Sequence, residues 1–194
     1  MNLENSDNEM YQALESIMIS EAQLQARIQE LGAQIGKDYA GKVPVVIGIL
    51  KGSAIFMADL VKAIPVHVTL DFMGISSYHG GTKSSGVVKI TKDLEETIEG
   101  RHVIIAEDII DTGLTLSYLI KSLKQRNPAS ISICTLLNKE AHRKMVVEDI
   151  KYVGFDVEDQ FVVGYGLDYM QKFRNLPCIG ILKPSVYQTQ HKEA

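Results

Sequence analysis

Two adjacent acids, Glu107 and Asp108, stand just before the stretch Asp-Thr-Gly-Leu-Thr at residues 111–115. They follow an apolar run at residues 103–106, where burial and mutual repulsion both disfavour charged carboxylates. The stretch at 111–115 connects an expected strand to an expected helix. There, glycine permits close approach to the backbone, the helix start offers unpaired N–H groups, and the threonines add hydroxyl donors. Together these residue types predict a cradle for a phosphate.

The acid pair is spaced to bind the rest of a phosphorylated sugar. Carboxylates that lie one sugar's length from a bound 5′-phosphate can accept hydrogen bonds from ribose hydroxyls or hold water on Mg²⁺. Two plainer interpretations stay open on these residues alone. Asp111 or Thr112 could cap the helix, and the two acids could be solvated at the end of a strand. The stretch is not a Walker loop, and the chain contains no G-x-G-x-x-G.

The elements that must position these residues alternate along the chain. A capping box at residues 20–23 opens a helix with apolar residues spaced by three or four. Further helices are expected at residues 54–64 and 113–126. Strands are expected at residues 43–50, 66–75, 87–90, 101–108, 130–137, 151–157, 161–167 and 178–182. This alternation predicts an α/β fold in which helices flank a mostly parallel, twisted sheet.

In folds of this class, ligands bind at the carboxyl ends of the strands. Three groups of candidate residues directly follow or end predicted strands, namely Lys51 with Gly52, Glu107 with Asp108, and Lys139. Their shared position at strand ends predicts that they meet in one site.

Composition excludes several classes of function. The net charge is −4 and no long run of Lys or Arg occurs, so the chain has no electrostatic footprint for nucleic acid or an anionic membrane. Its polar N-terminus is not a secretory signal, and no apolar run reaches the roughly 18 residues of a membrane helix. Cys134 and Cys178 lie in separate apolar stretches and are expected to be reduced core residues. We expect a cytoplasmic protein.

The signature around the acids, hydrophobic-x-E-D-I-I-D-T-G-x-T, resembles the phosphoribosyl pyrophosphate motif of type I phosphoribosyltransferases. It is most similar to the hypoxanthine-guanine phosphoribosyltransferases. Four further segments in matching order carry the same resemblance: ILKGSAIFMADL, ISSYHGGTKSSG, LLNKEAHR and DQFVVGYGLDYMQKFRNLP. The resemblance covers about residues 20–183. It implies the type I phosphoribosyltransferase fold, with a core at 40–165 whose lid spans 76–86, and a small hood subdomain from 1–39 plus 166–194.

The resemblance also implies a role for each matching residue on the sugar side of the site. The 5′-phosphate would be bound by Thr112, Gly113, Leu114 and Thr115. The ribose would be bound by Glu107 and Asp108, which together with Asp168 would hold Mg²⁺. Pyrophosphate would be bound by Lys51, Gly52 and Arg174, and the Leu50–Lys51 peptide can be cis in this family. Ser77 and Tyr78 would belong to the lid that excludes water.

On the purine side, the resemblance makes Asp111 the general base that takes a proton from the purine imidazole. Lys139 would donate to the 6-oxo group, Phe161 would stack on the purine, and the Val162 backbone would contact the 2-position edge. Plainer interpretations remain for each residue alone: a solvated lysine, a core phenylalanine, and a surface ion pair between Asp168 and Arg174.

The activity implied is transfer of a 5-phosphoribosyl group from phosphoribosyl pyrophosphate to hypoxanthine, guanine or both, giving IMP or GMP and pyrophosphate in purine salvage. The partners expected are these small molecules, Mg²⁺ and further copies of the chain in a dimer or tetramer, without nucleic acid or membrane. One alternative is a sibling enzyme that prefers xanthine. Another is a regulator of the same fold that senses phosphoribosyl pyrophosphate and binds nucleic acid, which the acidic net charge disfavours.

Overall fold

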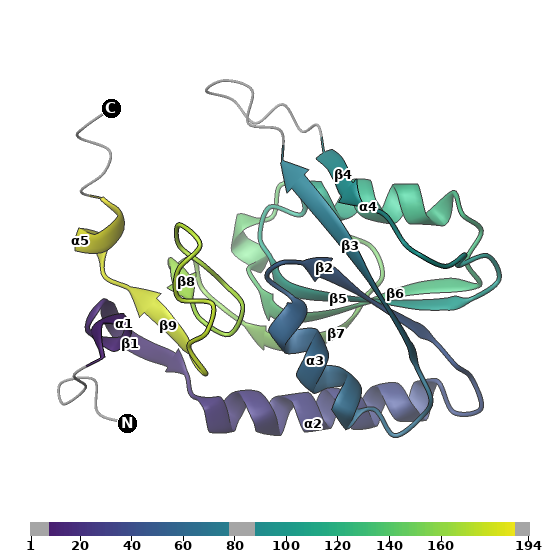
Figure 1. Ribbon diagram of the computed structural model, residues 1–194, viewed down its shortest axis with the longest axis horizontal. Coiled ribbons are helices and arrows are strands. Elements are labelled where there is room, and N and C mark those ends of the chain that lie inside the picture. Colours follow the sequence, from purple (N-terminus) through teal and green to yellow (C-terminus); the bar gives the residue numbers. More distant parts are fainter. Residues whose placement is uncertain (1–7, 78–87, 189–194) are drawn as a thin grey trace. The chain divides into compact units, whose positions relative to one another are not determined.

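The apolar runs of the sequence form a six-stranded sheet in a computed structural model that describes residues 8–77 and 88–188 (Figure 1). Its strand order is β4-β3-β2-β5-β6-β7, and only the pairing of β3 with β4 is antiparallel. The strands are β2 (Val45–Leu50), β3 (Thr69–Ser77), β4 (Val88–Lys92), β5 (His102–Ile110), β6 (Ser130–Asn138) and β7 (Ile150–Asp156). The predicted mostly parallel sheet is confirmed.

Helices cover both faces of this sheet, as the alternation of elements predicts. Figure 1 shows α4 (Leu114–Lys124) on one face and α3 (Ala54–Ala63) on the other. Alternate residues of each strand point to opposite faces, so every second residue of β2, β5 and β6 can join the core that α4 covers. The core beneath α4 includes Val45, Ile47, Ile49, Val103, Ile105, Ile131 and Ile133 from the strands with Leu116, Leu119, Ile120 and Leu123 from the helix.

The predicted capping box starts the longest helix, α2 (Glu21–Asp38). The backbone N–H of Ser20 donates to Oε1 of Gln23 at 2.9 Å, and the Gln23 N–H lies 3.4 Å from Oγ of Ser20. The apolar stripe read from the sequence is fully buried, at Leu24, Ile28, Leu31, Ile35 and Tyr39. Burial of one continuous stripe stabilises the helix more than its intrinsic propensity does.

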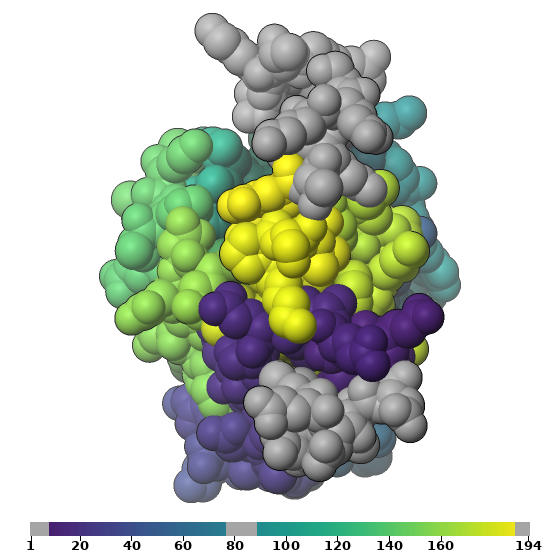
Figure 2. All heavy atoms as spheres, turned by 90° about the vertical axis from the view of Figure 1, so that its left-hand side faces the viewer, coloured from purple at the N-terminus to yellow at the C-terminus, as the bar shows by residue number. Residues whose placement is uncertain are grey.

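A second, three-stranded antiparallel sheet has the order β1-β9-β8. It joins β1 (Leu14–Ile19) from near the N-terminus to β8 (Val162–Val163) and β9 (Ile179–Leu182). Short helices α1 (Glu9–Gln12) and α5 (Pro184–Tyr187) adjoin this sheet in the sequence. Figure 2 shows the purple N-terminal segment beside the yellow C-terminal one, as their pairing requires. The strand β1 is not among the strands that the sequence predicts.

The contacts within the chain divide it into two compact units. The large unit comprises residues 27–159, and the small unit comprises residues 1–26 and 160–194. The expected subdomain boundaries lie at 39/40 and 165/166, whereas those of the compact units lie at 26/27 and 159/160. The first of the observed boundaries falls inside α2.

No helix among residues 8–77 and 88–188 is both long enough and apolar enough to span a bilayer. Both cysteines are buried and free, as expected from their apolar surroundings. Burial raises the pKa of the Cys134 and Cys178 thiols, which keeps them protonated at neutral pH.

Candidate active site

The acids Glu107 and Asp108 lie within β5, which continues to Ile110, rather than where the strand emerges. Glu107 pairs with Thr135 of β6 in the parallel ladder. Its Oε2 is buried and has no hydrogen-bond partner in the part of the chain that the structure describes. Burial first, and the neighbouring charge of Asp108 second, raise the pKa of Glu107 well above its ordinary range. Glu107 is thus held in an environment that disfavours its negative charge.

The loop after β2 closely approaches this acid pair. A Cβ atom placed on Gly52 would lie 1.7 Å from Oδ2 of Asp108, so any larger residue would force that carboxylate or the loop to shift. The Leu50–Lys51 peptide is cis, as the resemblance implies. Ser53 then donates from Oγ to the Ile49 carbonyl at 2.8 Å and precedes α3. The structure therefore brings the predicted pyrophosphate loop and the predicted ribose-binding acid together.

The predicted phosphate cradle begins α4. Gly113 is the N-cap residue, with φ of 77° in the left-handed region, and no side chain caps the helix. The plainer interpretation, in which Asp111 or Thr112 caps α4, is therefore not what the structure shows. Leu114 and Thr115 are exposed at the helix start. An uncapped, exposed helix N-terminus offers N–H donors to an anion.

The segment after the η2 turn (Glu140–His142) contacts this cradle through backbone hydrogen bonds. The Thr112 carbonyl accepts hydrogen bonds from the backbone N–H groups of Lys144 and Met145, at 3.0 and 3.2 Å. A Cβ atom on Gly113 would lie 2.7 Å from Cγ2 of Val147, so the segment also requires glycine there. The cradle is thus fixed by backbone contacts that do not depend on its own side chains.

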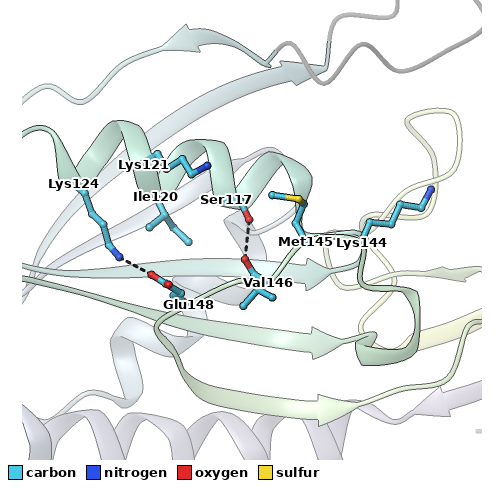
Figure 3. A pocket seen from close by; sticks show the side chains of 8 residues that line it. All are labelled: Ser117, Ile120, Lys121, Lys124, Lys144, Met145, Val146 and Glu148. Atoms are coloured by element: carbon cyan, nitrogen blue, oxygen red, sulfur yellow. Dashed lines mark hydrogen bonds and ion pairs between the residues drawn. The ribbon is translucent and has the colours of Figure 1, made fainter.

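Figure 3 shows a pocket between α4 and the same segment. In it, Ser117 donates to the Val146 carbonyl at 3.4 Å, and Lys124 pairs with Glu148 at 3.2 Å. Its lining consists of Ser117, Ile120, Lys121, Lys124, Lys144, Met145, Val146 and Glu148. The lining includes no residue predicted for the site.

Asp111 and Lys139 are linked through two residues that sequence reasoning missed. His142 lies 3.0 Å from Asp111 through Nδ1 and 2.7 Å from Asp159 through Nε2. Asp159 also lies 3.4 Å from Nζ of Lys139, which is only 8% exposed. His142 belongs to the segment LLNKEAHR that carries the resemblance, but its spacing gives no sign of its partners. The plainer interpretation of Lys139 as a solvated lysine does not agree with its burial.

In the small unit, Phe161 is 40% exposed and makes two aromatic contacts. Its ring stacks on Tyr187 with centroids 4.9 Å apart, and meets Tyr169 edge-on at 5.6 Å. Val162 begins β8, an edge strand, and pairs with Ile181 of β9. Phe161 is therefore not a plain core residue, because a large part of its ring reaches solvent.

Asp168 and Arg174, also in the small unit, form an ion pair of 2.6 Å between Oδ1 and Nη2. Arg174 donates further to the Gly166 carbonyl at 2.7 Å, and the Gln171 N–H donates to Asp168 at 2.8 Å. Several residues of this loop have positive φ, at Tyr165, Met170, Gln171 and Phe173. The loop thus holds Asp168 and Arg174 together as an ion pair. An ion pair between them is one of the interpretations that the sequence left open.

The remaining predicted residues belong to the lid. Ser77 is the last residue of β3, so it lies in a strand, whereas Tyr78 and residues 79–86 lie outside the described part of the chain. Of the other predicted residues, the large unit contains those for sugar, phosphate and the general base, together with Lys139. The small unit contains Phe161, Val162, Asp168 and Arg174.

Comparison with known proteins connects this geometry to a family. Residues 19–170 match the model of a phosphoribosyl transferase domain. The hypoxanthine-guanine phosphoribosyltransferase of Bacillus subtilis (strain 168) is 52% identical over 178 residues, covering 91% of this chain and 97% of that protein. The protein of that name from Staphylococcus aureus (strain Mu50 / ATCC 700699) is also 52% identical, covering 92% and 99%. A crystal structure of a hypoxanthine phosphoribosyltransferase from Staphylococcus aureus has a TM-score of 0.90 at 51% identity, covering 94% of this chain and 99% of that one.

Proposed function

The chain belongs to the phosphoribosyltransferase family, and we propose that it transfers the 5-phosphoribosyl group from phosphoribosyl pyrophosphate to a 6-oxopurine. Hypoxanthine and guanine are the substrates that its relatives' names support. The predicted family and fold class are confirmed by these similarities. The observation that carries the proposal is the close approach of Gly52 to Asp108. The neighbouring Glu107 has a buried oxygen, Oε2, with no hydrogen-bond partner among the described residues.

Ribose and phosphate would be bound by groups of the large unit that lie in the last part of β5 and in the segment that follows it. Hydroxyl groups of the ribose would donate to Glu107 and Asp108, giving Oε2 of Glu107 the donor that it lacks among the described residues. The 5′-phosphate would accept hydrogen bonds from N–H groups and hydroxyls of Thr112, Gly113, Leu114 and Thr115. Leu114 would contribute through its backbone alone, so the cradle has no cationic side chain at that position.

Mg²⁺ fits the acid pair as a cofactor. No cluster of three or more His, Cys, Asp or Glu side chains within the described ranges could hold a metal by itself. Mg²⁺ instead binds through one or two carboxylates together with water and substrate phosphates. Glu107 and Asp108 supply such a pair of hard oxygen ligands. A cation beside them would stabilise the charged form of Glu107, which burial disfavours. We propose Asp168 as a ligand of a second Mg²⁺, for which it would exchange its contact with Arg174.

The purine would lie against residues with complementary groups. Asp111 would accept the proton of the imidazole part, and Lys139 would donate to the 6-oxo oxygen. Phe161 would stack on the ring, which the exposed part of its side chain supports. The Val162 backbone would contact the 2-position edge. The small unit, which contains Phe161 and Val162, would correspond to the expected hood.

In the reaction, a purine nitrogen would attack the anomeric carbon while the bond to the pyrophosphate oxygen breaks and its electron pair leaves with pyrophosphate. The purine proton would pass to Asp111. Positive charge would develop on the sugar, beside the carboxylates of Glu107 and Asp108. Lys51, Gly52 and Arg174 would bind the departing anion, and Mg²⁺ when bound supplies further positive charge there. Residues 76–86, with Ser77 and Tyr78, stay the predicted lid.

We also propose a cytoplasmic homo-oligomer, a dimer or a tetramer, without nucleic acid or membrane as a partner. The net charge of −4 supports the absence of nucleic acid. Light scattering after gel filtration measures the oligomeric state, and a monomer would contradict this part of the proposal.

The central experiment measures pyrophosphate release with phosphoribosyl pyrophosphate, Mg²⁺ and each purine in turn. Release with hypoxanthine or guanine is expected, whereas release with xanthine alone would identify the xanthine-preferring sibling. No release with any purine would contradict the proposed function. In that case, salt-dependent binding to RNA or DNA would favour the regulator of the same fold.

A further inference from the structure

Two residues that the proposed chemistry does not use, His142 and Asp159, connect Asp111 to Lys139. Nδ1 of His142 lies 3.0 Å from Oδ1 of Asp111, and Nε2 lies 2.7 Å from Oδ2 of Asp159. The other carboxylate oxygen of Asp159 lies 3.4 Å from Nζ of Lys139. All four side chains belong to the large unit, so this series of contacts forms within one compact part of the chain.

We propose that His142 is a positioning residue for the transfer reaction, acting on Asp111 directly and on Lys139 through Asp159. The inference rests on the proposed function, in which Asp111 is the general base and Lys139 binds the 6-oxo group. These two residues would contact different parts of one rigid purine, its imidazole and its 6-oxo oxygen. Their spacing must therefore match the purine, and a planar imidazole ring held between two carboxylates fixes that spacing.

The backbone places His142 beside Asp111. Lys139 follows the end of β6, and its N–H donates to the carbonyl of Ile110 at 3.0 Å. The chain then turns through η2, where the His142 N–H donates to the Lys139 carbonyl at 3.3 Å. This tight turn directs the imidazole toward the residue that follows Ile110. Local backbone geometry near Asp111 and near His142 thus brings the two side chains into contact.

The contact with His142 orients the carboxylate of Asp111. When Nδ1 carries a proton it donates to Oδ1, which leaves Oδ2 to accept the purine proton. Asp111 is 47% exposed, so its side chain could otherwise adopt several rotamers. Misplacement of a catalytic group by about 1 Å can cost roughly 100-fold in rate. A neutral imidazole has one N–H and an imidazolium has two, so only the cation donates to both carboxylates.

His142→Ala tests the proposal by removing both contacts. Turnover with hypoxanthine should fall about tenfold, because the general base would be misoriented in part of the molecules. The KM for phosphoribosyl pyrophosphate should stay within about twofold, since Glu107 and the phosphate cradle are not touched. The measurement is steady-state kinetics of the full-length protein with each substrate varied in turn.

Two conservative variants separate the two contacts. In His142→Asn the amide nitrogen can occupy the place of Nδ1, so the contact with Asp111 remains, and most of the turnover should return. In His142→Gln the amide nitrogen reaches the place of Nε2 and contacts Asp159 instead. This variant should keep the wild-type KM for hypoxanthine, through Lys139, but not the turnover.

Glu140→Ala is the matched control, because Glu140 is exposed on the same η2 turn. It should leave both kinetic constants unchanged. Equal losses in His142→Ala, His142→Asn and Glu140→Ala would show a merely structural turn and overturn the proposal, as would wild-type turnover in a folded His142→Ala. If His142→Ala does not fold, the kinetics of the Asn and Gln variants decide. A wild-type protein inactive with every purine would instead contradict the proposed function itself.

Discussion

Two acidic centres of the large unit differ in how completely their side chains are hydrogen bonded. On the ribose side, Oε2 of Glu107 is buried without a partner among the described residues, beside the second acid Asp108. On the purine side, His142 lies between the carboxylates of Asp111 and Asp159, at 3.0 and 2.7 Å, and Asp159 also pairs with Lys139. The ribose-side centre therefore has an electrostatic cost within the fold, whereas each purine-side carboxylate contacts a nitrogen of the His142 or Lys139 side chain.

Burial explains why the difference matters. Asp111, His142 and Asp159 are about half exposed, at 47%, 46% and 51%, so each ion pair among them contributes little to stability. Oε2 of Glu107 is buried, and the raised pKa of this carboxyl reflects the cost of charging it there. We infer that the ribose side favours function over stability, whereas the purine side is organised mainly for orientation.

Asp111→Asn should give the largest effect on the purine side. Turnover should fall by about 10²–10⁴-fold, since an amide cannot accept the purine proton as a general base. The amide oxygen still accepts from His142, so stability should change little. Binding of phosphoribosyl pyrophosphate with Mg²⁺, measured by calorimetry, should be mostly retained. Normal turnover in this variant would refute the assignment of Asp111 as the base.

Gly52→Ala should give the largest binding effect on the ribose side. The new Cβ would lie 1.7 Å from Oδ2 of Asp108, so either the carboxylate or the loop must move. The KM for phosphoribosyl pyrophosphate should rise about tenfold or more, equivalent to about 1.4 kcal/mol, in steady-state assays. Gly100→Ala is the control, because Gly100 has a φ of 67° but open space around its Cβ position. That variant should lose stability while keeping its KM, and an unchanged KM in Gly52→Ala would contradict the assigned contact.

Elements with strong patterns could be predicted from the sequence alone. The buried stripe of α2 and the apolar run of β2 were predicted because periodicity and burial agree there. β1 was missed, since its residues, LESIMI, break the strict alternation of a half-buried strand. The end of β5 was placed too early at Asp108. Ladder hydrogen bonds involve backbone groups, so a strand can continue past charged side chains to Ile110.

The contacts of the site also differ in whether the sequence alone could predict them. The phosphate cradle and the acid pair are contiguous in sequence, so residue type and spacing were enough to predict their proximity. The approach of Gly52 to Asp108 and the contact of His142 with Asp159 join separate segments. Such contacts depend on how strands and turns are placed in space, and no local pattern in the sequence encodes them. The family resemblance supplied the order of the motifs but not these two contacts.

Glu107→Gln should give a smaller effect that sharpens the comparison, because it removes the charge disfavoured on the ribose side. Since the folded pKa of Glu107 is raised above its ordinary value of 4.5, its contribution to stability is fully present below that value. The contribution is lost as the pH rises through the folded pKa, whereas glutamine loses nothing. Thermal unfolding without substrates should therefore give a higher Tm for the variant at about pH 8, by roughly 2–4 °C for each kcal/mol gained. Below about pH 4 the advantage should disappear.

Catalysis should respond in the opposite direction to Glu107→Gln, because the amide no longer stabilises positive charge on the ribose or binds Mg²⁺ well. Glu99→Gln replaces an exposed acid of the large unit and should show no comparable dependence of the Tm difference on pH. A Tm difference for Glu107→Gln that is equal at both pH values would mean that packing, not charge, causes it. A less stable variant at about pH 8 would mean that the charged Glu107 is well solvated or paired. Either outcome would remove the contrast between the two acidic centres, whereas a more stable but less active variant would establish that the ribose side trades stability for function.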